Sequence, residues 1–438
     1  MRSSYVGRPI THRYSLIRNL SLAEASMRVG LCRGGHSGED MMSTNRPSSA
    51  IDLFDRAGID NPYPLYRQLR NIGPAVWLEK NGLWCIPRYK EVKAVLGDHR
   101  RFTTAHGVAM DPAVNKATSG PGQANSLTSD PPFHDQMRRI TGAPLLPNAL
   151  KDIQGTIQAA ARRVVDDICQ RRRVDGMADV AHVLPLTVVS ELVGLPPYGR
   201  ESMLRWAAAT FNAMGPMNEL GQQALPQIQE LHRFCREDAV PGKLKPDGWA
   251  ARIYAAAERG EVPIQQCPGM MREYIGPSLD TTIFATGHLL RLLGEHPAQW
   301  QLLREDRSLV SAAINEALRM EAPIRSFSRY VREDSVFDDV AIPAGDRVLV
   351  LYASANRDER KWDRPDEFDI TRNPRDHVAF GFGIHTCAGM HLARLEIAAL
   401  LTELLERVER FDVGTPEISY NNTLRGYASL PMTVHPVP

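Results

Sequence analysis

A short loop of phenylalanine and glycine that ends on one cysteine constrains this sequence more than any other feature. Residues 380–389 read Phe-Gly-Phe-Gly-Ile-His-Thr-Cys-Ala-Gly, and an apolar run with helical spacing follows from Leu392 to Leu404. The glycines allow the backbone to approach its neighbours closely. Cys387 is therefore expected just before a helix N-terminus, where free N–H groups and the helix dipole favour a thiolate.

A thiolate in this position indicates a ligand for a soft metal. No second cysteine or histidine stands at the spacing of a zinc site, and zinc takes four N or S ligands. The pattern instead indicates a single axial ligand to a metal whose other positions are already filled, as in haem. The alternative is a buried and inert cysteine, which is how we interpret the other five cysteines, at positions 32, 85, 169, 235 and 267.

The loop resembles the haem loop of the cytochromes P450, F-x-x-G-x-x-x-C-x-G, which Phe380, Gly383, Cys387 and Gly389 match. The resemblance extends over about residues 50–438, with four further motifs in the family's order. It implies a mainly α fold with a minor β region, in which a single large helical domain encloses the haem. The implied cofactor is haem b (iron protoporphyrin IX), with Cys387 as the iron ligand and Phe380 and Gly389 in the cofactor-binding loop.

The segment Glu316-Ala-Leu-Arg319 lies about seventy residues before the cysteine, as the family's E-x-x-R motif does. On a helix, residues i and i+3 share a face and can pair. The resemblance implies a structural pair that holds the core near the haem loop. The family's third member comes from a P-x-R-F segment, but residues 365–368 read Pro-Asp-Glu-Phe here. Arg364 and Arg372 are the nearby candidates for that role.

Residues 276–282, Gly-Pro-Ser-Leu-Asp-Thr-Thr, lie within a stretch that the apolar spacing predicts as one long helix. Buried polar groups are costly unless they are hydrogen-bonded, and one interpretation is a hydroxyl bonding back to a helical carbonyl. The segment is also similar to the family's A/G-G-x-D/E-T motif. That resemblance implies catalytic roles: Thr281 hydrogen-bonds dioxygen over the haem, and Asp280 relays protons from solvent.

This segment departs from the family pattern at Pro277 and Ser278, where small residues are usual. A proline inside a helix removes a hydrogen bond and kinks the helix. A kink is compatible with an oxygen pocket, and it also changes how water and protons reach the iron. The hydroxyl of Ser278 adds a further group that can relay protons.

Four cations are candidates for binding the haem propionates. Residues 130–138 match the family's D-P-P-x-H-x-x-x-R, and His134 and Arg138 stand on one helix face. The resemblance adds Arg329 and His385 to this set. Each of the four, taken alone, is more typical of a solvated surface residue; together, at positions that match the family, they indicate a propionate-binding set.

Length alone predicts two or three domains, but no linker or long charge block divides the 438 residues. We expect residues 46–438 to form the P450 domain. Residues 1–45 are rich in arginine and serine, and we expect a disordered N-terminal extension, with a transit peptide as the alternative. The coarse pattern predicts a hairpin at 74–87, a long loop at 103–132, helices over 150–320 and strands at 340–352.

Charge and cysteine usage restrict the partners and the compartment. A formal net charge of +1 gives no reason to expect nucleic acid. Scattered cysteines fit a reducing compartment, and no apolar run looks long enough to span a bilayer. We therefore expect a cytoplasmic monomer with no membrane anchor.

The resemblance places the substrate pocket at the 104–127 loop, residues 206–218, the face near 274–282 and two short turns. Its apolar candidates, each with ordinary core as the alternative, are Phe211, Met214, Met217, Leu279, Ile324 and Phe327. Arg325 and Ser326 would anchor a carboxylate or a hydroxyl; alternatively, Arg325 faces solvent. A small aromatic or terpenoid substrate is the resulting expectation.

The predicted function is that of a haem-thiolate monooxygenase, which places one atom of O2 in a small apolar substrate by hydroxylation or O-dealkylation. Electrons would come from NAD(P)H through ferredoxin reductase and ferredoxin, because the sequence has no visible flavin or G-x-G-x-x-G segment. A peroxygenase using hydrogen peroxide is one alternative, against which the Asp280–Thr281 pair argues. A haem-binding sensor without turnover is the other.

Overall fold

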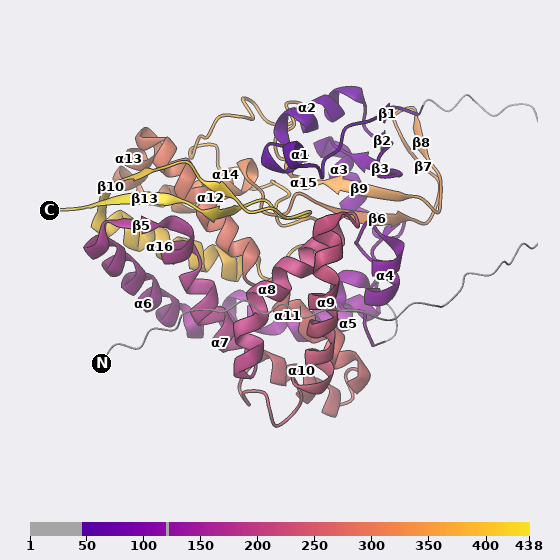
Figure 1. Cartoon of the computed structure of the whole chain (residues 1–438), viewed down its shortest axis with the longest axis horizontal. Helices are drawn as coiled ribbons and strands as arrows, with labels where there is room; N and C mark the ends of the chain where they lie inside the picture. Colours follow the sequence, from indigo (N-terminus) through magenta and orange to yellow (C-terminus); the bar gives the residue numbers. More distant parts are fainter. Residues whose placement is uncertain (1–45, 120–121) are drawn as a thin grey trace, which may run out of the picture. The chain divides into compact units, whose positions relative to one another are not determined.

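The computed structural model describes residues 46–119 and 122–438. The predicted extension at 1–45 lies outside the described residues. Helices make up most of the described chain (Figure 1). They are α1 (Arg56–Asp60), α2 (Tyr63–Ile72), α3 (Tyr89–Gly97), α4 (Pro112–Ser119), α5 (Phe133–Gly142), α6 (Pro147–Arg171), α7 (Ser190–Val193), α8 (Pro197–Met214), α9 (Glu219–Glu237), α10 (Trp249–Glu258), α11 (Cys267–Ile275), α12 (Asp280–Glu295), α13 (Pro297–Glu305), α14 (Val310–Met320), α15 (Tyr352–Ala355) and α16 (Met390–Arg407).

The strands form one larger sheet and three small ones. The larger sheet has the order β1-β2-β3-β9-β6-β4, and the small sheets are β10-β13-β5, β11-β12 and β7-β8. Their bounds are β1 (Ser48–Ser49), β2 (Val76–Leu78), β3 (Leu83–Ile86), β4 (Phe102–Thr103), β5 (Arg173–Asp175), β6 (Ser326–Val331), β7 (Ser335–Phe337), β8 (Val340–Ile342), β9 (Arg347–Leu351), β10 (Val408–Val413), β11 (Glu417–Ile418), β12 (Tyr427–Ser429) and β13 (Pro431–Pro436). The predicted mainly α fold with a minor β region is confirmed.

The hairpin predicted at 74–87 is present as β2 and β3. The two strands pair antiparallel with Trp77 opposite Trp84, and Gly82 has a φ of 63° in the turn between them. That left-handed conformation is one that glycine adopts without strain. The hairpin joins the larger sheet because β3 pairs parallel with β9.

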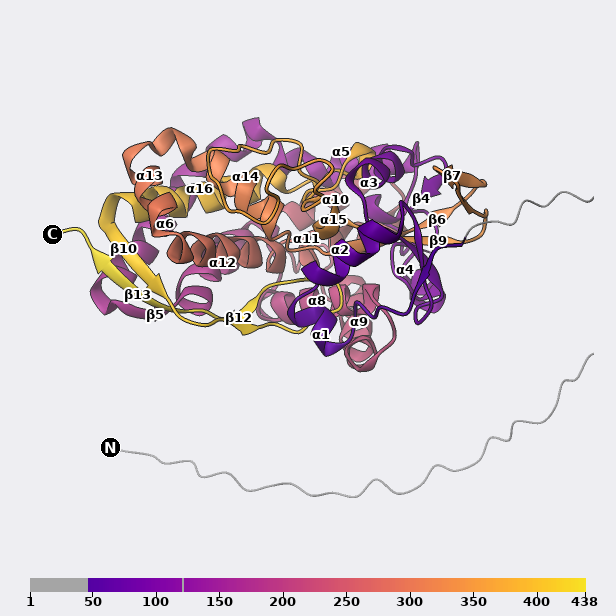
Figure 2. The same cartoon turned by 90° about the horizontal axis from the view of Figure 1, so that it is seen from above.

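The main core is formed by helices that position the cysteine loop. α16 follows the loop and packs against α6 and α14, and α12 packs against α14. α12 is buried on nearly every side, as expected for a helix that is apolar around most of its circumference. Figure 2 shows α12 between the β10/β13 end of the molecule and the larger sheet. A second hydrophobic cluster lies around β3, β9 and α3.

The prediction of one long helix through residues 276–282 is wrong. α11 ends at Ile275 and α12 begins at Asp280, with four irregular residues between them. Pro277 has no backbone N–H to donate, so the ladder of helical hydrogen bonds is interrupted at this residue. The proline therefore separates two helices instead of kinking one.

The stretch 103–132 contains a helix that the loop prediction missed. Pro112 begins α4, and the carboxylate of Asp111 accepts hydrogen bonds from the N–H groups of Ala113 (2.7 Å) and Val114 (3.3 Å). An acceptor before the helix and a proline at its first position are start signals. The Asp111–Pro112 signal was overlooked because Gly, Ser, Thr and Pro are so frequent in the surrounding stretch.

One segment, Gly176–Val193, is long and apolar enough by composition to cross a membrane, with a mean hydropathy of 1.3. The expectation that no apolar run is long enough to span a bilayer is therefore wrong by length and composition. The segment is 56% buried inside the protein, and its first part packs against α6 and α12. These contacts are those of a core helix.

Candidate active site

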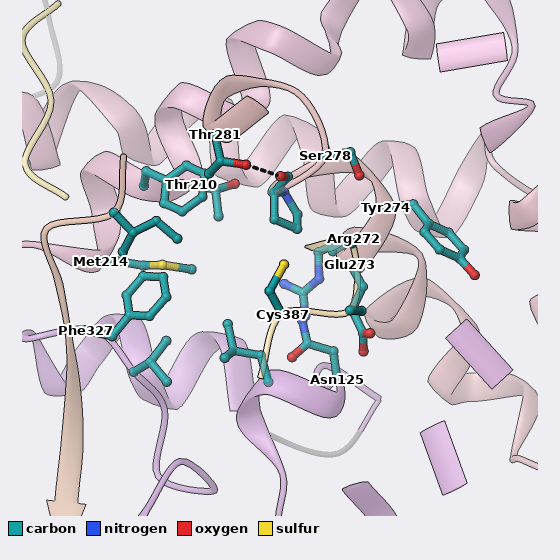
Figure 3. A pocket seen from close by; sticks show the side chains of 18 of the residues that line it. Asn125, Thr210, Met214, Arg272, Glu273, Tyr274, Ser278, Thr281, Phe327 and Cys387 are labelled. Atoms are coloured by element: carbon teal, nitrogen blue, oxygen red, sulfur yellow. Dashed lines mark hydrogen bonds between the residues drawn. The ribbon is translucent and has the colours of Figure 1, made fainter. Parts of the chain in front are cut away.

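A cavity of about 440 Å³ opens above the cysteine loop. Its wall combines apolar side chains from α8 and β6 with polar ones from α5, α11, α12 and α16 (Figure 3). Volumes in this range are typical of small-molecule and cofactor sites. The cavity brings Cys387 together with Thr281, Arg138, Arg329 and His385.

The loop geometry holds Cys387 at the cavity floor. The N–H of Cys387 donates to the carbonyl of Phe380 at 2.8 Å, which closes the loop. Gly383 has a φ of +73°, and a Cβ there would lie 2.6 Å from the carbonyl oxygen of Leu96. Only glycine fits so close to α3 in this conformation. The loop ends at Gly389, the residue before α16.

Cys387 lines the cavity, and its side chain is exposed there although the protein surrounds the site. Burial raises the pKa of the Cys387 thiol, and the N–H groups of Gly389 and Met390 and the cations of Arg138 and Arg394 act in the opposite direction. The predicted effect of the helix N-terminus is therefore present, but burial outweighs it. A positive metal ion on the sulfur would supply the missing stabilisation of a thiolate.

Four basic side chains, which we call the cation cluster, gather at this site: Arg138, Arg329 and His385 line the cavity, and His134 packs against His385. The rings of His134 and His385 meet edge to face with centroids 4.8 Å apart. His385 Nε2 lies 3.0 Å from Thr104 Oγ1. Burial, Arg329, His134 and Arg138 lower the pKa of His385 to about 2.

The two arginines of the cation cluster donate to neutral acceptors. Arg138 donates to the carbonyl of Thr386. Arg329 donates to the carbonyl of Ser328 at 2.9 Å and to the Tyr352 hydroxyl at 3.3 Å. Within residues 46–119 and 122–438, neither guanidinium has an ion pair with a carboxylate. The cluster thus concentrates positive charge that its protein neighbours do not neutralise.

These features fit a haem. His134 is buried, and among the residues that the structure describes its Nε2 atom has no hydrogen-bond partner; a propionate oxygen would supply one. No group of three His, Cys, Asp or Glu side chains in the described chain is arranged to hold a metal ion. One sulfur ligand beneath a cavity and unneutralised cations on its wall suit a macrocycle that brings its own metal and two carboxylates.

The pair Glu316–Arg319 is fully buried and bidentate, with both N···O distances at 2.8 Å. Arg372 donates to the same carboxylate at 3.1 Å, so it is the third member. We call these three residues the Glu316 network. Arg364, the other candidate, pairs with Asp363 and Glu367 at the surface. Glu367 contributes its backbone carbonyl to Arg319 at 3.3 Å.

Asp280 and Thr281 begin α12. The Thr281 hydroxyl donates to the carbonyl of Pro277 at 3.0 Å (Figure 3), the back-bond that one interpretation of the sequence anticipated. Asp280 is buried, and burial raises the pKa of its carboxyl to about 7. Thr281 and Ser278 line the cavity.

Four of the six predicted apolar substrate residues line the cavity, whereas Met217 and Leu279 do not. Phe211, Met214, Ile324 and Phe327 are in its wall, and the rings of Phe211 and Phe327 stack with centroids 6.5 Å apart. Leu279 is buried in the main core and is not part of the wall. The irregular turn before α12 directs it inward, which a continuous helix would not.

Arg325 neither anchors a ligand nor faces solvent. Its side chain is 2% exposed, and it donates to the carbonyls of Leu53 (3.1 Å), Gly58 (3.2 Å) and Asn422 (2.5 Å). It joins three distant chain segments, so it is structural. Ser326 is also buried and absent from the wall.

Three charged cavity residues were missed by sequence reasoning: Arg272 and Glu273 on α11, and Glu396 on α16. Both carboxyl oxygens of Glu396 are buried without a hydrogen-bond partner, and burial raises the pKa of this carboxyl to about 8. The signal that could have found them is a charged residue on the apolar face of a helix.

Comparisons with known proteins agree with this geometry. The cytochrome P450 family profile matches residues 285–430. Cytochrome P450 CYP199A2 of Rhodopseudomonas palustris is 36% identical over 392 residues, which are 89% of this chain and 95% of the relative. Linalool 8-monooxygenase of Pseudomonas putida is 28% identical, over 86% of this chain and 96% of the relative.

Solved structures match equally broadly. Mycobacterium marinum cytochrome P450 CYP268A2, in complex with pseudoionone, superposes with a TM-score of 0.78 at 26% identity. The match covers 89% of this chain and 100% of that chain. The fold and site are those of a haem-thiolate oxidoreductase. More particularly, the chain belongs to the cytochrome P450 family and is a P450 monooxygenase.

Proposed function

We propose that this monooxygenase places one oxygen atom from O2 in a C–H bond of a compact, largely apolar molecule, by hydroxylation or O-dealkylation. The observation that carries the proposal is the single cavity that Cys387, Thr281 and the apolar pair Phe211 and Phe327 share. A substrate held by the aromatic side chains would lie in the same space as the haem. The relative that hydroxylates linalool supports a substrate of this kind.

The haem, when bound, supplies a thiolate-ligated iron that activates O2 and favours cleavage of the O–O bond. In our proposal, Cys387 binds the iron and the cation cluster binds the propionates. Phe380 and Gly389 belong to the loop that contacts the cofactor. The burial of the cation cluster strengthens each charge-assisted hydrogen bond to a carboxylate.

Asp280 is suited to hold and release a proton. With a pKa raised to about 7 by burial, its carboxyl exchanges protons near neutral pH, as an efficient acid–base group should. The hydroxyls of Thr281 and Ser278 can pass that proton into the cavity, since each hydroxyl both donates and accepts. Ser278 lies in the turn between α11 and α12, and Asp280 and Thr281 begin α12; Asp280 itself is not in the cavity wall.

Electrons would come from NAD(P)H through a separate reductase and ferredoxin, and the protein would act as a cytoplasmic monomer. A peroxygenase would have less use for the Asp280–Thr281 pair. A sensor would consume no NAD(P)H. Both alternatives are distinguished by product formation with surrogate redox partners in the absence of peroxide.

Replacement of Thr281 tests the proposed proton relay. Thr281→Ala should retain haem and substrate binding but release more peroxide, and product per NAD(P)H should fall by about 10-fold, within the range of positioned acid–base groups. Thr286→Ala is the matched control, because Thr286 makes the same back-bond, to Thr282 at 2.8 Å, and does not line the cavity. Equal coupling in wild type and Thr281→Ala would contradict the proposed role.

Replacement of Cys387 tests the iron ligand. Cys387→Ser should lose the thiolate-type band of the ferrous–CO complex, because a hydroxyl lacks the electron donation of a thiolate. Cys169→Ser, at a half-buried free cysteine outside the cavity, should keep that band. A normal band in Cys387→Ser would exclude Cys387 as the ligand.

A further inference from the structure

Arg272 on α11 is a cavity cation outside the cation cluster. One terminal nitrogen of its guanidinium contacts His232 Nε2 on α9, and the other donates to the carbonyl of Gln123. Arg272 is therefore held by α9 and α11, whereas Arg138 lies on α5 and Arg329 on β6. In Figure 3, Arg272 lies with Glu273 and Asn125 on one side of the cavity, and Met214 and Phe327 lie on the other.

The charge of Arg272 is not neutralised by the protein. The described chain offers it no carboxylate at ion-pair distance: both of its partners are neutral acceptors. His232 is neutral because burial and the Arg272 charge lower its pKa to about 3. A guanidinium stays protonated in proteins, and burying a charge without a counter-ion is costly. An anion in the cavity would offset that cost.

The adjacent carboxyl of Glu273 is already used. It accepts hydrogen bonds from the N–H (2.5 Å) and hydroxyl (2.9 Å) of Ser126 and from the Thr141 hydroxyl (2.8 Å). These bonds hold it away from an ion pair with Arg272. Burial raises the pKa of this carboxyl, and the Arg272 guanidinium beside it carries one positive charge. A single negative charge is therefore favoured over two.

We propose that Arg272 binds the carboxylate of the substrate, and that the substrates are compact monocarboxylic acids with an apolar body. The carboxylate would face α11, and the apolar body would contact Phe211 and Phe327. Because the cavity of about 440 Å³ must also contain the haem, the acid is small. This inference rests on the proposed monooxygenase function and specifies its substrate class.

Binding of matched ligands to the haem-loaded protein tests the inference. The probes are 4-alkylbenzoates from methyl to butyl, the corresponding benzamides and the corresponding 4-alkylphenyl phosphates, titrated by calorimetry and by the Soret spin-state shift. Wild type should bind the best benzoate at least about 10-fold more tightly than its benzamide and its phosphate. Arg272→Gln should weaken benzoate binding about 10- to 100-fold, the range for a hydrogen bond to a charged group, and leave the benzamide unchanged.

Two further variants exclude a general structural effect. Arg272→Lys keeps the charge and should retain part of the preference for benzoate. Arg236→Gln removes an exposed arginine from α9 and should change nothing. Absence of an acid preference at every chain length, or an equal loss of benzoate and benzamide affinity in Arg272→Gln, would overturn the inference; tighter phosphate binding would overturn the choice of a carboxylate.

The inference and the proposed function fail separately. If the benzoate binds through Arg272 but no oxidised product forms with NAD(P)H and redox partners, the proposed function is wrong and the binding site stands. If other substrates are oxidised while Arg272 does not discriminate between acid and amide, the monooxygenase stands and the carboxylate site is wrong.

Discussion

Two groups of buried charge in this protein differ in whether the chain itself neutralises them. In the Glu316 network, one carboxylate receives two arginines, and Arg319 also donates to the carbonyls of Asn356 (3.0 Å) and Pro365 (2.8 Å). In the cation cluster, Arg138 and Arg329 donate only to neutral groups, and one His134 nitrogen has no partner. The first group is complete within the chain, and the second requires carboxylates from outside it.

Whether the chain itself neutralises a buried charge therefore distinguishes structural charges from ligand-binding charges, without reference to motifs. A buried network whose hydrogen bonds are all made fixes the positions of the segments that it joins. Removal of one member leaves its partner as a buried charge without a counter-ion. A buried charge without a counter-ion lowers the stability of the folded protein. Binding of a ligand with the opposite charge offsets that loss. Three substitutions, taken in order of expected effect, examine this distinction.

The largest effect is expected at the centre of the Glu316 network. Arg319→Leu should lower the free energy of unfolding by about 3–5 kcal/mol, because it leaves the buried Glu316 carboxylate with Arg372 and the N–H of Asp369 as its remaining partners. Denaturant unfolding of the holoprotein measures the change. Arg364→Leu, which removes an exposed ion pair with Glu367, should cost less than about 1 kcal/mol. Similar losses for both variants would contradict the assigned difference.

In the cation cluster, Arg329→Leu should affect the cofactor more than the fold. The apoprotein should be as stable as wild type or more so, since an unneutralised buried cation is removed. The haem affinity should fall about 10- to 100-fold through loss of a charge-assisted bond to a propionate. Transfer of haem to apomyoglobin measures the affinity, and unfolding of the apoprotein measures stability. A large loss of apoprotein stability would place Arg329 with the structural charges.

The third effect, at Glu396, is the smallest at acidic pH and appears only as the pH rises; within the described residues this buried carboxyl has no hydrogen-bond partner. Burial raises the pKa of this carboxyl from its ordinary 4.5 to about 8. The folded state therefore binds the proton more tightly than the unfolded state, and wild-type stability falls as pH rises from about 4.5 to 8. Glu396→Gln should therefore be more stable than wild type above pH 8, by roughly a few kcal/mol at most. The two should converge near pH 4. A pH-independent difference in unfolding free energy would show that the carboxyl has another partner.

Sequence reasoning succeeded where the determinants are local. The cysteine loop, the hairpin around Gly82 and the helical pair Glu316–Arg319 depend on residues only a few positions apart. The third member of the Glu316 network depends on the path of residues 364–372, which brings Arg372 inward and leaves Arg364 at the surface. Two arginines eight positions apart in an irregular segment offer no periodicity that could distinguish them.

The errors had identifiable physical causes. The helix through 276–282 was predicted whole because apolar spacing continues across it, whereas Pro277 interrupts the hydrogen bonds that spacing does not report. Leu279 was placed in the cavity by the family resemblance, and it lies in the core instead. Arg325 was judged by its neighbours in sequence, but its three acceptors come from residues 53, 58 and 422. Such long-range carbonyl contacts leave no local pattern.

The interruption between α11 and α12 has a consequence for how this enzyme can diversify. Arg272 and Glu273 belong to the helix before the gap, and Asp280 and Thr281 to the helix after it. Because no continuous ladder of backbone hydrogen bonds joins the halves, a new side chain or a small tilt in the first half need not propagate to the second. Residues that select the substrate thus lie on a different helix from the residues proposed to deliver protons. Substitutions on α11 can change the substrate without altering the position of Asp280 or Thr281.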